Sequence, residues 1–170
     1  MFEQYSDRAM RIVFIARLKA GRDGASTLDL PHLLASVLIE DQGGQLGKEL
    51  TGIPINGDHV TTSRSRTSQV HKPFFLFTTA RRLLRQLEKQ PLRRPPIPPT
   101  PDLPLSPAAK SVLQAATWLK ERFEQQEVTP LHLLAAALLR DGASAALFRE
   151  AGVTAETVLE FVRSQTQEQH

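Results

Sequence analysis

The chain has 170 residues, of which 41% are hydrophobic and 23% charged, the balance of a globular protein with a buried core. It contains no cysteine, which excludes disulfide bonds, thiolate metal sites and cysteine nucleophiles. Residues 60–100 carry a charge of +8 within a total of +3, so the rest of the chain is net negative. With no long apolar stretch and no apolar leader, the composition predicts a cytoplasmic protein without a membrane segment.

Two helices are expected in the first 42 residues. Ser6 is a good N-cap for the first helix, whose apolar residues recur with a 3.6-residue period, and Gly21 or Gly24 can end it. Asp29 is the expected N-cap of the second helix, and the acids Glu40–Asp41 at its end are expected to be solvated. A short helix is expected at 45–50, after which residues 60–70 fit either a strand or a loop.

The middle of the chain combines basic and proline-rich sequence. A helix is expected from Thr78 to Lys89, with leucines on one face and basic side chains on the other. Phe74, Phe75 and Phe77 precede or begin it, and we expect them to anchor the segment to the rest of the protein rather than to stack on nucleic-acid bases. Eight of the twelve prolines lie in residues 91–107, which predicts an extended connector, more simply a spacer than a ligand for an SH3-type groove.

The two outer parts of the sequence are copies of each other. An offset of 100 residues aligns Ser6–Ile53 with Ser106–Val153 without a gap, and eleven of the 48 pairs are identical. The second copy should therefore repeat the first, with N-caps at Ser106 and Thr129 and a first helix that continues to about Gln126. A short helix at 144–151 and a helix after Thr154 should follow. The pattern predicts an all-α fold of two pseudo-symmetric four-helix repeats packed together, covering 1–60 and 105–170, with residues 61–104 as an atypical basic, proline-rich connector.

The series MFEQYSDRAMRIVFIA and HLLASVL, followed in the second copy by LSPAAKSVLQAA, TPLHLLAAALLRD and ALFREAGV, resembles the N-terminal domain of the Clp/Hsp100 protein unfoldases. The resemblance implies a fold of two four-helix repeats that docks protein substrates and adaptors in front of an ATPase ring. Family members commonly have glutamate before the His of the His-Leu-Leu helix, where in some of them it helps to form two phosphoarginine sites. Those positions are Pro31 and Leu131 here, and neither side chain accepts a hydrogen bond from a guanidinium group.

The predicted function is therefore binding without catalysis. The segment Gly43–Glu49 has the wrong spacing for a P-loop, no G-x-S-x-G motif is present, and no metal or cofactor is expected. We expect a protein substrate, an adaptor or a Clp-type unfoldase component to bind in the groove between the repeats and at the starts of the first two helices. The candidate binding residues are Ser6, Asp29, His32, Ser106, Thr129 and His132, with the alternative that both histidines are structural and bond to the preceding loop.

A second hypothesis uses the basic middle. Residues 64–94 could bind nucleic acid or another polyanion through their positive charge. The residues that would do so are Arg81, Arg82, Arg85, Lys89, Arg93 and Arg94. No DNA-binding sequence pattern accompanies them, which makes a protein partner the favoured prediction.

Overall fold

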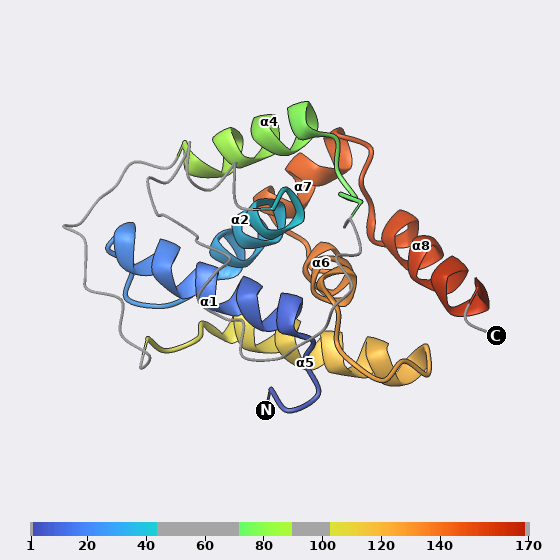
Figure 1. The fold of residues 1–170 in the computed structure, drawn as a ribbon. Coiled ribbons are helices and arrows are strands. Elements are labelled where there is room, and N and C mark those ends of the chain that lie inside the picture. Colours follow the sequence, from blue (N-terminus) through green and yellow to red (C-terminus); the bar gives the residue numbers. More distant parts are fainter. Residues whose placement is uncertain (1, 44–71, 90–102, 169–170) are drawn as a thin grey trace.

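The computed structural model describes residues 2–43, 72–89 and 103–168, and these form seven α-helices with no strand longer than a single bridge (Figure 1). The predicted all-α fold class is confirmed. The expected helix at 45–50, the segment 60–70, most of the proline-rich connector and the proposed end of the first repeat at residue 60 lie outside the described residues. The helices are α1 (Asp7–Arg22), α2 (Leu30–Asp41), α4 (Phe77–Glu88), α5 (Pro107–Arg122), α6 (Pro130–Leu138), α7 (Ala143–Glu150) and α8 (Ala155–Glu168).

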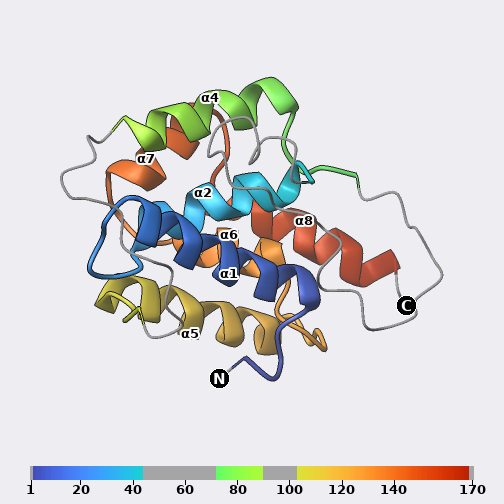
Figure 2. The same ribbon diagram turned by 60° about the vertical axis from the view of Figure 1, so that its left-hand side comes forward.

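The two repeats share one core. In both views α2 and α6 lie in the centre, with α4 on one side and α5 on the other (Figures 1 and 2). The central helices are apolar around most of their circumference, as expected of buried helices. Helix α1 packs against α2 as α5 packs against α6, and α4 packs against α2 as α8 packs against α6. The duplication seen in the sequence is therefore also a duplication of helix packing.

The first helices of the two repeats begin and end at equivalent residues. Ser6 and Ser106 are the N-caps, and their hydroxyl oxygens accept hydrogen bonds from the backbone N–H three residues later, at 3.2 and 3.1 Å. Both helices end two residues before a left-handed residue, Gly24 with φ +66° and Glu124 with φ +54°. The prediction that the second copy continues to Gln126 is wrong, because the left-handed turn at Glu124 ends the helix despite the lack of a glycine.

The repeats are tied together by two short parallel bridges related by the offset of 100 residues. Tyr5 pairs with Val128, and Leu28 pairs with Leu105. The bridge at Val128 is closed by hydrogen bonds from Val128 N to Gln4 O (2.7 Å) and from Ser6 N to Val128 O (3.0 Å). Each repeat therefore brings the start of its first helix to the start of the other repeat's second helix.

The end of α2 is covered rather than solvated. Glu40 and Asp41 are only 5% and 6% exposed. The carboxylate of Asp41 accepts hydrogen bonds from the backbone N–H groups of Phe74 (2.8 Å) and Phe75 (2.9 Å), and Glu40 is paired with Arg8. The expectation that this acidic pair is solvated is wrong, because the segment before α4 folds back over α2 and α1 supplies a cation.

The aromatic residues before α4 join the two repeats. Phe75 is buried and makes an edge-to-face contact with Phe148 of α7, and Phe74 makes one with Phe161 of α8 at 5.4 Å between ring centroids. The anchoring prediction is confirmed for these two, whereas Phe77 is 43% exposed. Helix α4 buries Ala80, Leu83 and Leu84 as expected, and Leu87 is partly buried. Lys19 of α1 donates a hydrogen bond to Glu88, the last residue of α4, at 2.8 Å.

In the described ranges, no single helix is long and apolar enough to cross a membrane. The bent pair α6 and α7 meets the length and composition criteria together, with an angle of 108° between them. Across residues 2–43, 72–89 and 103–168, no three or more His, Cys, Asp or Glu side chains are grouped so that they could hold a metal ion.

Candidate functional site

An open pocket with a volume of about 900 Å³ lies between the two repeats. The starts of α1 and α6 meet there because of the bridge between Tyr5 and Val128. The ends of α2, the segment that precedes α4, and α8 complete the walls. The lining residues are Ser6, Asp7, Arg8, Val37, Asp41, Lys72, Pro73, Phe74, Phe75, Thr129, Pro130, Leu131, Leu134, Phe161 and Gln165.

The α1 side of the pocket is polar. Arg8 donates two parallel hydrogen bonds to the carboxylate of Glu40, both at 2.8 Å, and Arg11 lies 3.7 Å from the same carboxylate. This bidentate geometry fixes the guanidinium group, so Arg8 forms a positioned wall of the pocket rather than a mobile one. Asp7 and Lys72 are exposed on the pocket's lining and add one charge of each sign.

The α6 side begins with Thr129, Pro130 and Leu131 and is set by a capping box. The Nδ1 atom of His132 accepts a hydrogen bond from Thr129 N at 2.9 Å, and the Thr129 hydroxyl lies 3.0 Å from the same atom. His132 is fully buried, and its pKa is lowered to about 4. Burial is the larger cause, and the nearby positive charge of Lys120 is the smaller one. The imidazole is therefore neutral at neutral pH, with its proton on Nε2.

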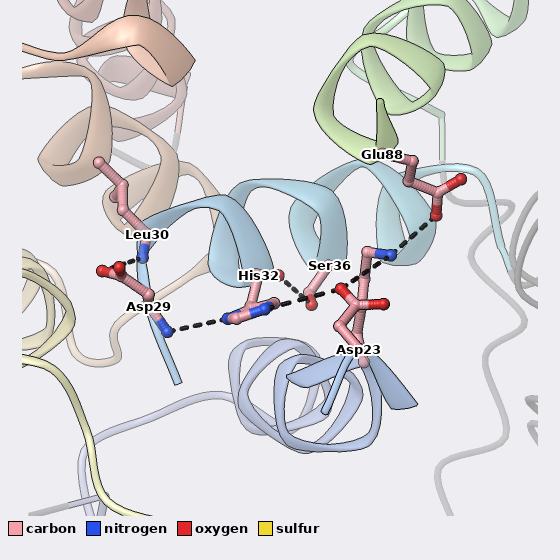
Figure 3. A network of polar contacts seen from close by, with 7 residues as sticks. Asp23, Asp29, Leu30, His32, Ser36 and Glu88 are labelled. Carbon is pink, nitrogen blue, oxygen red and sulfur yellow. Dashed lines mark hydrogen bonds and ion pairs between the residues drawn. The ribbon is translucent and has the colours of Figure 1, made fainter. Parts of the chain in front are cut away.

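We call each place where the first helix of one repeat begins beside the second helix of the other repeat a corner. The corner of α2 and α5 is built from the equivalent sequence positions, but its side chains make different contacts. Ser106 is 8% exposed, and its hydroxyl donates to Asp29 Oδ1 at 2.8 Å. Asp29 N donates to His32 Nδ1 at 3.0 Å, and the other ring nitrogen of His32 lies 3.7 Å from Asp23 (Figure 3). Burial lowers the pKa of His32, although the charge of Asp23 opposes this effect.

Helix α4 is attached to this network through Lys19. Its ammonium group lies 2.8 Å from Glu88 and 3.8 Å from Asp23, and its side chain is 8% exposed. Figure 3 shows Glu88 on α4 at the end of the row of polar contacts that starts at Asp29. The corner at Asp29 is thus a closed set of contacts between α1, α2, α4 and α5.

The six predicted binding residues separate into three groups of two. Ser6 and Thr129 line the pocket, whereas Ser106 and Asp29 bond to each other at the equivalent corner. Neither His32 nor His132 lines the pocket, and both bond to the backbone of their own N-cap, as the structural alternative expected. That these six residues bind a partner stays a prediction.

Sequence reasoning missed the residues that other elements bring to the pocket. Lys72 and Phe74 come from the segment before α4, and Phe161 and Gln165 come from α8. Phe74 was expected to be an anchor, and it is both an anchor and a pocket wall. Phe161 lies on α8, which has 14 residues, and nothing in the sequence pattern linked this aromatic residue to Ser6.

The predicted polyanion-binding residues between Arg81 and Lys89 do not line this pocket. Arg82, Arg85 and Lys89 are exposed on α4, and Arg81 is partly buried. Glu88, the acidic residue of this helix, is engaged by Lys19. Arg93 and Arg94 lie outside the described residues.

Residues 104–170 match the family "Clp repeat (R) N-terminal domain". Three solved structures share the fold along the chain. The N-terminal domain of the chaperone ClpD from Arabidopsis thaliana is 20% identical with a TM-score of 0.61, and covers 98% of this chain and 97% of its own. A protein from a malarial protein secretion system is 17% identical with a TM-score of 0.71 (97% and 96% covered). The Hsp104 N-terminal domain from Candida albicans is 23% identical with a TM-score of 0.59 (96% and 89% covered).

The comparison with curated proteins gives no significant sequence match. The structural likenesses establish the fold, and the family match lies in the second copy of the repeat. The first copy departs further from the family in sequence, yet its helices pack in the same way.

Proposed function

Because residues 104–170 are a Clp repeat and the fold is that of a Clp N-terminal domain, we propose that this protein binds an extended segment of another protein in the pocket between its repeats. Clp N-terminal domains are non-catalytic docking modules for substrates and adaptors. For this chain, the partner would be a client or an adaptor of a Clp-type unfoldase, or a component of that machine, in the cytoplasm.

The observation that carries the proposal is the open pocket of about 900 Å³ where α1 and α6 begin. Its walls combine apolar side chains with a few fixed polar groups, the usual composition of a site that recognises side chains. Phe161 is 44% exposed there and faces Phe74, so an aromatic surface is available without any rearrangement of the core. Exposed aromatic residues of this kind contribute most of the free energy at protein interfaces.

The pocket supports binding rather than chemistry. Its buried carboxylate, Asp41, accepts from two backbone N–H groups, its guanidinium at Arg8 is paired with Glu40, and its second carboxylate, Asp7, is exposed. The histidines, the residues best suited to proton transfer at neutral pH, do not line the pocket, and Nδ1 of each accepts a hydrogen bond from the backbone of its own N-cap. We therefore propose that the protein is not an enzyme.

The test is the affinity for a permanently unfolded protein, reduced and carboxymethylated lactalbumin carrying a fluorescent label. Phe161→Ser should weaken binding by about tenfold, because the variant removes an aromatic wall of the pocket. Phe14→Ser is the matched control, since Phe14 is 59% exposed on α1 and does not line the pocket. Equal effects of the two substitutions, or no binding by the unmodified protein, would contradict the proposal.

A second candidate function is polyanion binding by α4. The observation in its favour is that Glu88 is paired with Lys19, which leaves the positive charge of Arg82, Arg85 and Lys89 uncompensated on this helix. Affinity for duplex or single-stranded DNA should then fall steeply with salt. The double variant Arg82→Ser/Arg85→Ser should lose this binding, while Arg122→Ser/Arg149→Ser keeps it. Salt-independent or absent binding would eliminate this candidate.

A further inference from the structure

The offset of 100 residues predicts two equivalent corners, yet the two corners differ in composition. Helix α1 begins Ser6-Asp7-Arg8, whereas α5 begins Ser106-Pro107-Ala108. The two charged side chains at the first corner both line the pocket. Their counterparts at the second corner carry no charge and no side-chain hydrogen-bonding group, so only the first corner has polar side chains at these positions.

The N-cap hydroxyls also differ. Ser106 is 8% exposed and donates its proton to Asp29 across the boundary between the repeats. The residue equivalent to Asp29 is Thr129, whose side chain is engaged with His132 in its own capping box. The hydroxyl of Ser6 is more exposed, lines the pocket and accepts from Ala9 N, and within the described ranges it has no acceptor for its own proton. A ligand can therefore use the Ser6 hydroxyl, whereas the Ser106 hydroxyl is occupied.

The apolar part of the first corner comes from several elements. Leu131 is the second residue of α6, and it shares the pocket with Val37 of α2 and Leu134 of α6. Phe74 and Phe161 form the aromatic side. Lys72 stands exposed on the same lining, and no acidic partner for it is described. The apolar and aromatic side chains complement an apolar side chain, and Lys72 complements an acidic neighbour of it, whereas the exposed Asp7 lies on α1 at another wall of the pocket.

We propose that the protein has one binding site per chain, at the corner of Ser6 and Leu131, and that this site takes an apolar side chain of an extended protein segment whose neighbouring acidic residue pairs with Lys72. At the corner of Ser106 and Pro31, the hydroxyl of Ser106 is occupied by its hydrogen bond to Asp29, so this corner joins the repeats and is not part of the proposed site. This inference rests on the proposed docking function and names its stoichiometry and its specificity.

The test uses nuclear magnetic resonance with the ¹⁵N-labelled protein and a synthetic heptapeptide that contains phenylalanine, leucine and aspartate in sequence. Leu131→Glu places a carboxylate in the apolar pocket, and Pro31→Glu places one at the equivalent position of the other corner. Both positions are the second residue of a helix, where glutamate is favourable, so both variants should fold. The first variant should weaken peptide binding by at least about tenfold, and the second by less than about twofold.

The amides that shift on titration locate the site. Shifts at residues 6–8, 131 and 161, with one peptide bound per chain, support the inference. Equal shifts at residues 29, 30, 106 and 108, two peptides bound per chain, or equal losses of affinity in the two glutamate variants would overturn the inference while leaving the docking function in place. A peptide whose aspartate is replaced by lysine should bind more weakly, and an unchanged affinity would overturn the role of Lys72. If neither the heptapeptide nor unfolded lactalbumin binds, the docking function itself fails.

Discussion

The buried His132 should make the protein lose stability in mild acid. Its pKa is lowered to about 4, whereas in the unfolded chain it has the ordinary value of about 6.5. The unfolded state therefore takes up a proton first as the pH falls, and the unfolding free energy decreases from about pH 6.5 down to about pH 4. A shift of this size corresponds to about 3 kcal/mol in total, of which about 2.5 kcal/mol is lost by about pH 4.5.

The structural cause is the surroundings of the two ring nitrogens, neither of which favours the charged imidazolium. Nδ1 accepts from Thr129 N, so a proton on this atom would oppose another N–H group and break the cap. Nε2 is buried without a partner among the described residues, so no acceptor stabilises a charged ring. His32 differs from His132 because a carboxylate, Asp23, lies 3.7 Å from its Nε2. The residue equivalent to Asp23 in the second repeat is Phe123, which carries no charge.

The assay is urea denaturation between about pH 7 and about pH 4.5 for the unmodified protein and for His132→Asn. Asparagine retains an acceptor for Thr129 N but does not titrate, so the variant should lose about 2.5 kcal/mol less over this range. His32→Asn is the matched control and should change the pH dependence less. A difference below about 1 kcal/mol for His132→Asn, or an imidazole that titrates above about pH 6 by nuclear magnetic resonance, would refute the reasoning.

Three further substitutions test the packing. Ser106→Ala should lower the unfolding free energy by about 1–2 kcal/mol in urea denaturation, because it removes a helix cap and a buried hydrogen bond between the repeats. Ser6→Ala should cost less, and equal losses from the two variants would contradict this prediction. Asp41→Ala should reduce hydrogen-exchange protection of the Phe74 and Phe75 amides, and unchanged protection would show that other contacts hold the segment. Glu124→Gly should raise stability by about 0.5–1 kcal/mol by relieving the positive φ, and a loss would refute the strain.

Much of the fold could be predicted from local sequence. The serine N-caps, the capping residues Asp29 and Thr129, and the 3.6-residue apolar period identify α1, α2, α5 and α6, because each signal acts within one or two turns of a helix. Because the two copies align, the helices of the second copy could be predicted from those of the first. The error at Gln126 has the same origin, since nothing local required Glu124 to adopt a left-handed conformation.

The site was less predictable because its parts meet through long-range contacts. Ser6 and Thr129 were correctly placed at helix starts, but the sequence assigned Ser6 and Ser106 the same role. Only the structure separates them, through the bond between Ser106 and Asp29. The burial of Glu40 and Asp41 was likewise invisible, because Arg8 and the backbone of Phe74 and Phe75 are more than 30 residues distant in the chain.

The sequence by itself therefore determined the helical repeat, its caps and the concentration of positive charge in the middle of the chain, since composition, period and capping are local properties. The tertiary structure decided which N-cap serine lines a pocket, Ser6, and which one bonds across the boundary between the repeats, Ser106. That choice depends on which side chains the crossed bridges at Val128 and Leu105 bring together, and on the return of the segment before α4 over the end of α2. The repeated sequence therefore encodes two similar helix pairs, and the contacts between them form a pocket of about 900 Å³ that Ser6 and Leu131 both line.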